Sequence, residues 1–250
     1  MLELSELTKH FGGVRAVDGV DLAVAEGEVL GLIGPNGSGK STIVNLICGL
    51  FPLTAGRVLF RGADISDLPP HARVVRGIAR TFQNIRLFGQ LTVWQNLWVA
   101  QNSGEQRHAE HFLTRWFGGA RRARDEIDRT LEFFDLAHKR DELATNLAFG
   151  EQRRLEFARA LAAKPSLVLL DEPAAGMNAE EIDQLDDRIR KLRRDGIAIL
   201  LIEHHVELVM SVADRIAVLN FGQKIAEGTP AEIQANPAVR EAYLGTAAAA

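Results

Sequence analysis

The sequence has 250 residues, 46% hydrophobic and 25% charged, a composition typical of a globular protein with one or two domains. Its formal net charge of −4 argues against a broad basic surface for nucleic acid, and its single cysteine, Cys48, excludes an internal disulfide and a multi-cysteine zinc site. The chain begins MLELSELTKHFGG, without the features of a secretory signal, and no apolar run approaches the roughly 18 residues of a membrane span, so we expect a cytoplasmic protein.

The chain opens with two alternating segments, LELSEL from Leu2 and VRAVDGVDLAV from Val14, which predict antiparallel strands. Three later segments are short apolar runs typical of central strands in a parallel sheet, buried on both faces. They span residues 28–34, 166–172 and 197–203. Helical patterns lie between them, at residues 40–50, 150–162 and 179–194. This alternation predicts a doubly wound α/β core.

Residues 87–162 break the alternation and are mostly helical, so we predict a helical insert there. Inside it, NSGEQRHAEHFLTRWFGGARRARDE predicts a loop and a short helix. His108 and His111 have a metal-ligand spacing, but nothing nearby in the sequence completes a site. Four arginines follow, and a solvated helix face is favoured over contact with anionic lipid head groups. They are Arg121, Arg122, Arg124 and Arg129.

The most specific motif is GPNGSGKST, residues 34–42, which we call the phosphate loop. It matches G-x-x-x-x-G-K-[ST], in which glycines let successive backbone N–H groups turn inward and form an anion site at a helix N-terminus. Lys40 can then reach the β- and γ-phosphates of a nucleotide, and Ser41 can hold Mg²⁺. The alternative, an ordinary glycine-rich turn, leaves the preceding strand and the following helix unexplained.

A second motif, LVLLDEP, places Asp171 and Glu172 after a buried strand, at the edge where open α/β sheets bind ligands. One carboxylate can hold Mg²⁺, and the other can polarise an attacking water. Such a pair alone is more often a solvated turn. Together with a phosphate loop, it favours the catalytic interpretation.

The third motif is LAFGE, residues 147–151, at the start of a helical stretch. We expect a core-facing stripe formed by Leu155, Ala158, Leu161 and Ala162. The face expected to point away carries Arg153, Arg154, Glu156 and Arg159. No Ser, Thr, Asp or Asn caps this helix, so its free N–H groups favour an anion. An ordinary helix start is the alternative for this motif alone.

The chain resembles the ATP-binding subunit of ABC transporters along almost its whole length. GPNGSGKST resembles the phosphate loop of that family, ARTFQN its glutamine loop and LAFGEQRRLEFARAL its signature. LVLLDEP is similar to its magnesium and base strand, AAGMN to its inter-subunit loop and LLIEHH to its histidine switch. The segments FGEQRRLEFARAL, DEPAAGMN, LLIEHHVELVMSVADRIAVLNFG and NPAVREAYLG are similar to the branched-chain, or hydrophobic, amino acid uptake branch.

The resemblance implies a P-loop NTPase fold, the ABC cassette, as one domain over residues 1–250. Its mostly parallel α/β core carries an antiparallel β subdomain, the helical subdomain is inserted at about residues 87–162, and residues 246–250 are a tail. Two such copies pack head to tail in this family, and each ATP lies between the phosphate loop of one copy and the signature of the other.

Residue roles carry over by motif. Glu172 is implied as the general base, His204 as a contact of the γ-phosphate, and Ser41, Gln83 and Asp171 as the groups around Mg²⁺. Phe11 resembles the aromatic that stacks on adenine. The implied phosphate contacts are Asn36, Gly37, Ser38, Gly39, Lys40, Ser41 and Thr42. Those implied across the dimer interface are Ala148, Gly150 and Asn178. An ordinary aromatic, a loop amide and a structural histidine remain the alternatives for Phe11, Gln83 and His204.

Four positions depart from the wider family. Ala148 replaces the usual signature serine and so removes one donor to phosphate, a bond that contributes about 1.5–3 kcal/mol. The backbone N–H groups remain, so we expect activity, at a lower rate. Glu151 replaces the commoner glutamine and should point away from phosphate, and Asn178 stands where aspartate is usual. His205 follows His204 where this branch often has aspartate, so a register error of one residue would exchange the two histidines.

The implied function is an ATPase that powers an importer of branched-chain or other hydrophobic amino acids, at the cytoplasmic face of the inner membrane. Its implied partners are a second ATP-binding subunit, transmembrane permeases and, indirectly, a periplasmic solute-binding protein. The glutamine loop and the helical insert should receive a permease helix. Trp94, Leu97 and Trp98 have helical spacing suited to that groove, with core packing as the alternative.

The nearest alternative is a cassette that serves another solute or exports lipid or lipopolysaccharide. ABC ATPases that act on nucleic acid carry long coiled coils, and no sustained heptads occur here, so we expect no nucleic acid partner. Translation factors of this type carry two cassettes, whereas this chain has one phosphate loop. The solute stays open, because the membrane and periplasmic subunits select it.

Overall fold

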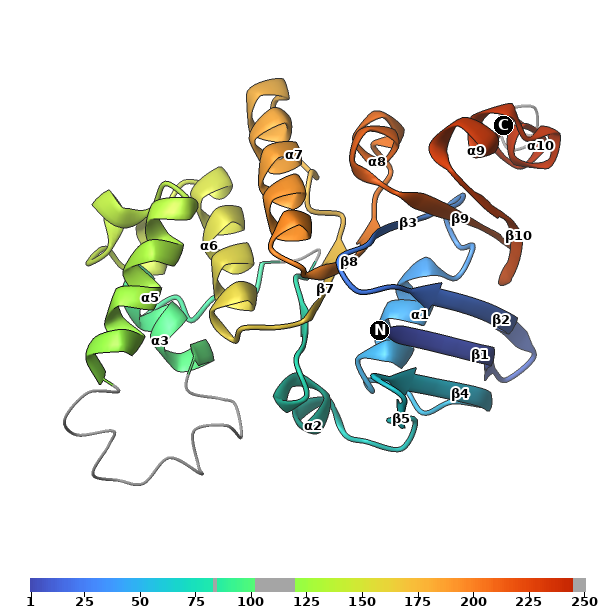
Figure 1. Cartoon of the computed structure of the whole chain (residues 1–250), viewed down its shortest axis with the longest axis horizontal. Helices are drawn as coiled ribbons and strands as arrows, with labels where there is room; N and C mark the ends of the chain where they lie inside the picture. The colour runs from blue at the N-terminus through green and yellow to red at the C-terminus, as the bar shows by residue number, and fades with distance from the viewer. Residues whose placement is uncertain (83–84, 102–119, 245–250) are drawn as a thin grey trace.

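The computed structural model describes residues 1–82, 85–101 and 120–244, which form two sheets and the helices that cover them (Figure 1). At the N-terminus, alternating apolar residues fold β1 (Leu2–Phe11) and β2 (Val14–Val24) into an antiparallel pair. β4 (Ala55–Phe60) and β5 (Ala63–Asp64) extend this sheet in the order β2-β1-β4-β5. The predicted antiparallel subdomain is confirmed.

The second sheet has the strand order β10-β9-β3-β8-β7-β6. Its strands are β3 (Val29–Ile33), β6 (Ile78–Arg80), β7 (Leu167–Asp171), β8 (Ala198–Ile202), β9 (Arg215–Asn220) and β10 (Gln223–Gly228). Neighbours from β6 to β9 are parallel, and β10 joins β9 antiparallel. Every residue of β3, β7 and β8 is buried, which explains their unbroken apolar sequences. The predicted, mostly parallel core is therefore confirmed.

The central strands supply side chains to two hydrophobic clusters. Leu30 and Leu32 of β3 pack with α1 (Lys40–Ile47) and with the antiparallel sheet. The neighbouring Val29 and Ile33 belong to the other cluster. That cluster also contains side chains of α7 (Ala179–Arg194) and α8 (Val206–Val212). Because successive residues of a strand point to opposite faces, one apolar run builds both cores.

The helix predicted over residues 40–50 is shorter than expected, because α1 ends at Ile47. The helix ends because Gly49 adopts the left-handed conformation, with a φ of 72°, and the N–H groups of Gly49 and Leu50 bond back to the carbonyl oxygens of Leu46 and Asn45 at 3.1 and 2.9 Å. This end is reinforced from α2 (Pro70–Val75) by the buried Arg73. Its guanidinium donates from Nη1 to the carbonyl oxygens of Leu46 and Ile47, at 2.7 and 2.8 Å. These bonds satisfy carbonyl groups that the end of a helix leaves without intrahelical partners.

The helical insert lies between β6 and β7, at the end of the molecule far from the antiparallel sheet (Figure 1). Its helices are α3 (Val93–Gln101), α5 (Ala120–Phe133) and α6 (Phe149–Ala162), with the single turns η3 (Ala137–Lys139) and η4 (Ala144–Asn146). The inserted helical subdomain of the predicted fold is thus confirmed. Residues 102–119, with His108 and His111, lie outside the described residues.

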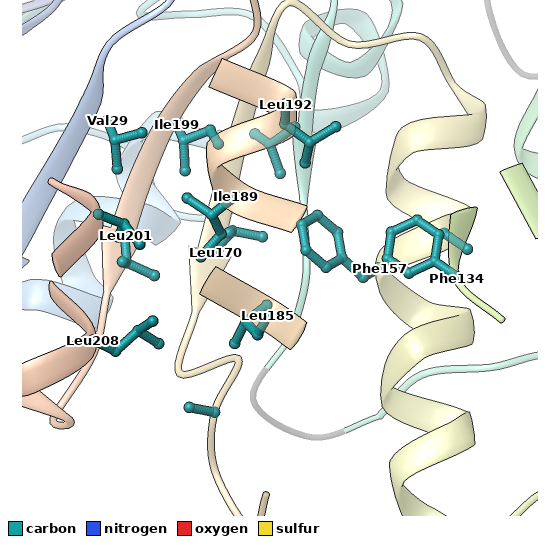
Figure 2. Packing of buried hydrophobic residues seen from close by; sticks show 14 of the residues in the cluster. Val29, Phe134, Phe157, Leu170, Leu185, Ile189, Leu192, Ile199, Leu201 and Leu208 are labelled. Carbon is teal, nitrogen blue, oxygen red and sulfur yellow. The ribbon is translucent and has the colours of Figure 1, made fainter. Parts of the chain in front are cut away.

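Two aromatic side chains join the insert to the core. Figure 2 shows Phe157 reaching from α6 toward α7, with Phe134 beside it. Their ring centroids are 5.1 Å apart, and both rings belong to the hydrophobic cluster that contains Leu185 and Ile189 of α7. One apolar cluster therefore continues from the parallel sheet through α7 into the insert, and it positions α6 against the core.

The polar face of α6 is not as predicted. Arg153 and Glu156, expected to face away, are buried. Glu156 Oε1 accepts the N–H groups of Phe82 and Arg86, both at 3.3 Å, and Arg153 Nη1 donates to the carbonyl of Phe82 at 3.4 Å. The chain leaves β6 here and has no ladder partner, so these two side chains satisfy its backbone. The predicted core stripe is confirmed at Leu155, Ala158 and Ala162, and Leu161 is partly buried.

The predicted groove residues on α3 are largely core. Leu97 is fully buried, and Trp94 and Trp98 are partly buried against the same hydrophobic cluster. Their rings stack on each other, with centroids 5.1 Å apart. Exposed apolar side chains occur nearby on the insert at Phe88 and Val99. The tryptophans therefore fit the core alternative better than an open groove.

The chain closes with α9 (Pro230–Ala235) and α10 (Pro237–Leu244), beyond β10. The hydroxyl of Thr229 caps α9, and Glu232 bonds back to the N–H of Thr229. Among residues 1–82, 85–101 and 120–244, no helix combines the length and the apolar character needed to span a bilayer. The predicted tail, residues 246–250, lies outside the described part of the chain.

Candidate functional site

The phosphate loop connects β3 to α1, and its backbone requires glycine. The φ angles are 154° at Gly34, 78° at Gly37 and 106° at Gly39, values that residues with a Cβ rarely adopt. A Cβ on Gly34 would lie 2.2 Å from the carbonyl oxygen of Leu219, and one on Gly39 would lie 2.4 Å from that of Ala16. The loop is therefore held tightly between β9 and β2 and can present its N–H groups to an anion.

A pocket of about 180 Å³ lies over this loop. Its lining residues are Ala16, Asn36, Gly37, Ser38, Gly39, Lys40, Ser41, Thr42, Glu172 and His204. The parallel sheet brings these segments together, because β3, β7 and β8 are neighbours and their carboxyl ends meet at one edge. Predicted phosphate contacts thus share one pocket with the predicted base and histidine.

Lys40 is buried at the first position of α1. Its Nζ donates to the carbonyl oxygens of Gly34 and Pro35 at 2.7 and 2.9 Å, and lies 3.4 Å from Ser38 Oγ. Burial lowers the pKa of Lys40, and the two carboxylates after β7 partly offset this effect. Because the ammonium group of Lys40 is shielded from water, a bound anion would stabilise its charged form. The pocket therefore favours phosphate groups.

Glu172 and His204 form a pair at the pocket wall. His204 Nε2 lies 3.0 Å from Glu172 Oε1. Glu172 has a φ of 50°, and its N–H donates to the carbonyl of Ile202 at 2.8 Å, which ties the end of β7 to the end of β8. His205 Nδ1 lies 3.9 Å from Glu207 Oε2 instead. Of the two histidines, it is therefore His204 that faces the predicted base.

Asp171 is buried and paired with a cation that the sequence prediction missed. Its Oδ2 accepts a hydrogen bond from Arg80 Nη2 at 2.6 Å, and Arg80 Nη1 donates to Asn45 Oδ1 at 2.6 Å. Ser41, the second residue of α1, lines the pocket. Hydroxyl and carboxylate oxygens are hard donors of the kind Mg²⁺ prefers, so this donor set fits that ion. Gln83, the third predicted group, lies outside the described residues.

Glu203 is a second site residue that the prediction missed. It is buried, its Oε1 accepts the N–H of Ala174 at 2.6 Å, and its Oε2 accepts those of His204 and His205 at 2.9 and 3.1 Å. The signal was a carboxylate directly after the apolar run of β8 and before two histidines. A carboxylate at such a position is buried only where donors surround it.

Phe11 lies at the end of β1, outside the lining of the pocket. Its ring is 43% exposed and lies edge-on to Phe51, with centroids 5.4 Å apart. The β2 strand that pairs with β1 contributes Ala16 to the pocket wall. A partly exposed ring beside that wall can stack on a planar ligand, and its predicted contact with adenine stays a prediction.

The signature helix, α6, begins at Phe149 without a side-chain cap. Within the described residues, the N–H groups of Phe149, Gly150 and Glu151 meet no acceptor. Glu151 was expected to point away, but its Oε2 accepts the N–H of Ala148 at 2.9 Å. The carboxylate folds back because this N–H has no intrahelical partner. The next N–H groups remain available to an anion.

The predicted interface residues do not reach the pocket of their own chain. Ala148, Gly150 and Asn178 are absent from its lining among the described residues. Asn178 instead caps α7, where its Oδ1 accepts the N–H of Glu181 at 3.0 Å. Glu181 Oε2 returns the bond to the N–H of Asn178, also at 3.0 Å. Asn178 therefore has a local capping role that the motif alone did not predict.

Comparison with known proteins gives two family matches. The family described as ABC transporter matches residues 17–175, and the family described as branched-chain amino acid ATP-binding cassette transporter matches residues 223–249. The chain is 44% identical to the high-affinity branched-chain amino acid transport ATP-binding protein BraF of Pseudomonas aeruginosa, over 99% of this chain and 98% of BraF. It is 37% identical to the lipopolysaccharide export system ATP-binding protein LptB of Escherichia coli, over 98% and 97%.

Solved structures give the same picture of the fold. The ADP conformation of MJ1267, an ATP-binding cassette of an ABC transporter, is similar with a TM-score of 0.84 and 33% identity, over 98% of both chains. The dimeric post-hydrolysis state of the ATP-binding cassette MJ0796, bound to ADP and Pi, has a TM-score of 0.78 and 26% identity, over 92% of this chain and 99% of that one.

Proposed function

Because this chain belongs to the ABC transporter family of ATP-binding cassettes, we propose that it binds ATP in the phosphate-loop pocket and hydrolyses it to drive solute uptake through membrane permeases. The observation that carries the proposal is the meeting of Lys40, Glu172 and His204 in one pocket. Phosphate binding and water activation are thereby available at the same place. We further propose that residues 1–250 act as a single cassette.

Phosphate binding rests on the loop backbone and on Lys40. Its Nζ already lies among loop carbonyl oxygens, so it is held where the β- and γ-phosphates would enter. Glu172 is the proposed general base, since its carboxylate reaches the pocket and can polarise a water for attack. His204, bonded to Glu172, keeps that carboxylate oriented and can contact the γ-phosphate.

The proposed Mg²⁺ site consists of Ser41 and Asp171, with Gln83 as the predicted third group. Bound there, the ion would neutralise phosphate charge during transfer. The Arg80 contact occupies one carboxylate oxygen of Asp171, and among the described residues no side chain pairs with the other. Mg²⁺ usually takes only one or two protein oxygens and completes its shell with phosphate and water, so two such donors are enough.

We place the complementary half of each site on a second cassette, as a homo- or heterodimer. The free N–H groups at the start of α6 form an anion site that does not reach the pocket of the same chain. A head-to-tail dimer would bring this site to the γ-phosphate held by the partner. The dimeric state of MJ0796 supports this arrangement by analogy.

The proposed solute class is branched-chain or other hydrophobic amino acids. Support comes from the match over residues 223–249 and from BraF, the relative with 44% identity. The chain is less similar to LptB, with 37% sequence identity, so the alternative of lipopolysaccharide export has weaker support. Import of such solutes implies permease subunits, a periplasmic solute-binding protein acting indirectly, and a position at the cytoplasmic face of the membrane. No nucleic acid partner is proposed.

The catalytic assignment is tested with Glu172→Gln and a matched exposed control on α5, Glu132→Gln. The Glu172 variant should bind ATP–Mg²⁺ and form a stable ATP-dependent dimer, while hydrolysis nearly disappears, because only water activation is lost. Affinity is measured by calorimetry, dimerisation by size-exclusion chromatography and turnover by phosphate release. Wild-type turnover in Glu172→Gln would place the base elsewhere.

The pairing of this chain with branched-chain amino acid permeases is tested in Pseudomonas aeruginosa lacking BraF. Expression of this chain should restore uptake of radiolabelled leucine, and the Glu172→Gln variant should not. Co-purification of the chain with the permeases shows that the complex has formed. A complex that forms but leaves leucine uptake unrestored would show that this chain does not power permeases of that class.

A further inference from the structure

Glu203 links the loop that follows Glu172 to the backbone of His204. Its Oε1 accepts the N–H of Ala174, two residues after Glu172, at 2.6 Å. Its Oε2 accepts the N–H of His204 at 2.9 Å and that of His205 at 3.1 Å. One buried side chain therefore holds both the loop after β7 and the loop after β8.

The pair depends on such a link because packing constrains the side chain of His204 only weakly. The side chain of His204 is 47% exposed, whereas that of Glu172 is 17% exposed. Their 3.0 Å contact thus depends on where the two backbones lie. The bond between Glu172 N–H and the Ile202 carbonyl and the bonds of the Glu203 carboxylate both connect the two loops at this point.

Only a carboxylate can make this set of bonds. All three neighbours are N–H donors, and an ionised carboxylate has two oxygens that only accept. Glutamine has the same shape but presents one oxygen and one NH₂ group. Its NH₂ would face an N–H donor and lose either the bond to Ala174 or the bonds to the histidines.

We propose that Glu203 is a positioning residue for ATP hydrolysis, holding Glu172 and His204 at the distance at which they act together. The proposal rests on the function proposed above. Glu203 does not line the pocket among the described residues, so it acts through the pair and not on the nucleotide. Its loss should therefore slow the chemical step and leave ATP binding nearly unchanged.

The test is single-turnover hydrolysis by Glu203→Gln at saturating ATP. We expect the rate to fall about 10- to 100-fold, since a misplacement of about 1 Å can slow catalysis by about 10²-fold. The affinity for ATP should change less than about threefold. The matched control is Glu207→Gln, which makes the same substitution in the first turn of α8, on a side chain that is 93% exposed.

A double-mutant cycle separates positioning from general damage. If Glu203 acts through the pair, Glu203→Gln should cause little further loss in a His204→Ala background, because the pair is already broken. A merely structural defect would multiply with His204→Ala. Equal fold-losses of Glu203→Gln in the two backgrounds would overturn the proposal, as would a wild-type rate in Glu203→Gln.

Glu203→Asp covers the case in which the glutamine variant does not fold. Aspartate keeps the charge and its local bonds to the histidine N–H groups but retracts from Ala174. If Glu203→Gln folds, we expect the hydrolysis rate of Glu203→Asp to lie between those of Glu203→Gln and wild type. If Glu203→Gln does not fold, we expect Glu203→Asp to hydrolyse ATP clearly more slowly than wild type. A wild-type rate in Glu203→Asp would contradict the link to Ala174. If His204→Ala and Glu172→Gln themselves keep full activity, the proposed catalytic site fails instead, which distinguishes the two failures.

Discussion

Lys40 illustrates how burial prepares a single side chain for phosphate. Its Nζ is desolvated, which lowers its pKa, and it bonds loop carbonyl oxygens rather than water. Phosphate oxygens at this position would form charge-assisted hydrogen bonds with Lys40 Nζ. These bonds would replace the hydration that the ammonium group has already lost on folding. The residue therefore serves ligand binding more than folding.

Lys40→Ala should weaken ATP binding about 10- to 100-fold without unfolding the protein, since a bond to a charged group contributes about 1.5–3 kcal/mol. Calorimetry measures the affinity, and thermal melting shows that the fold persists. The control is Lys191→Ala on α7, whose side chain is 52% exposed and pairs with Asp195. Unchanged ATP affinity in Lys40→Ala would contradict the phosphate-loop assignment.

Single residues differ in how well the sequence predicts them. The lining of the pocket was predictable because the phosphate loop needs glycines and a lysine at fixed spacing. Arg80 and Glu203 were missed because their value comes from partners far along the chain, Asp171 and Ala174. The position of Glu203 directly after an apolar run was a local signal, but the sequence did not show which N–H donors would surround its carboxylate.

Helices were predicted well where a single apolar face packs against the hydrophobic core. Periodicity located α6, and its apolar stripe is buried as expected. The same periodicity misplaced Arg153 and Glu156, because a polar side chain can be buried when it satisfies backbone groups from another segment. The end of α1 was misplaced for a different reason, since the left-handed Gly49 closes the helix before Leu50, where the apolar pattern ended.

Glu156 gives a prediction at this scale. Burial raises its pKa, and the N–H groups of Phe82 and Arg86 partly counteract this. The folded state thus takes up the proton at a higher pH than the unfolded chain, so protonation adds stability as the pH falls from the raised pKa toward the ordinary value of 4.5. At pH values above the raised pKa, the buried carboxylate is ionised, and its desolvation lowers the stability of the folded state. A neutral side chain at this position would avoid that loss.

Glu156→Gln keeps an oxygen for both N–H groups, because both donate to Oε1, and removes the buried charge. Its Tm should match or exceed that of wild type at pH 8, and the difference should shrink toward pH 5. Glu156→Ala removes both bonds and should lower the Tm by several degrees at both pH values. Thermal melting measures both, and equal losses for Gln and Ala would show that the bonds are unimportant.

For the whole molecule, the sequence predicted which segments are central strands but not their order. Apolar runs show that β3, β7 and β8 are buried on both faces, yet they do not say which strands are neighbours. The resemblance to a family supplied the cassette topology. The observed order places the carboxyl ends of these strands around the phosphate loop, and that placement creates the pocket.

The pocket of one chain is only part of the proposed ATP site, so the decisive test needs two chains. Gly150→Asp adds a carboxylate where the signature helix would meet the partner's γ-phosphate, and like charges repel strongly in a dry interface. ATP affinity of the monomer should stay normal, while ATP-driven dimerisation and hydrolysis should be lost. A Cβ at Gly150 would lie 2.4 Å from Glu181 Oε1, a movable side-chain end, so Gly150→Ala serves as the control for bulk without charge.

Mixing Gly150→Asp chains with Lys40→Ala chains then separates action within a chain from action across the interface. In a heterodimer with sites shared between chains, one site combines both lesions and the other has an intact phosphate loop and an intact signature. Hydrolysis should therefore reappear in the mixture although neither variant is active alone. If each lesion acted on the nucleotide of its own chain, both sites would remain broken. Suppose that the two sites of the dimer hydrolyse ATP independently. Verified heterodimers without hydrolysis would then contradict an ATP site shared between the two chains. That independence is measured in dimers of wild-type and Glu172→Gln chains, where one working site should retain about half of the activity.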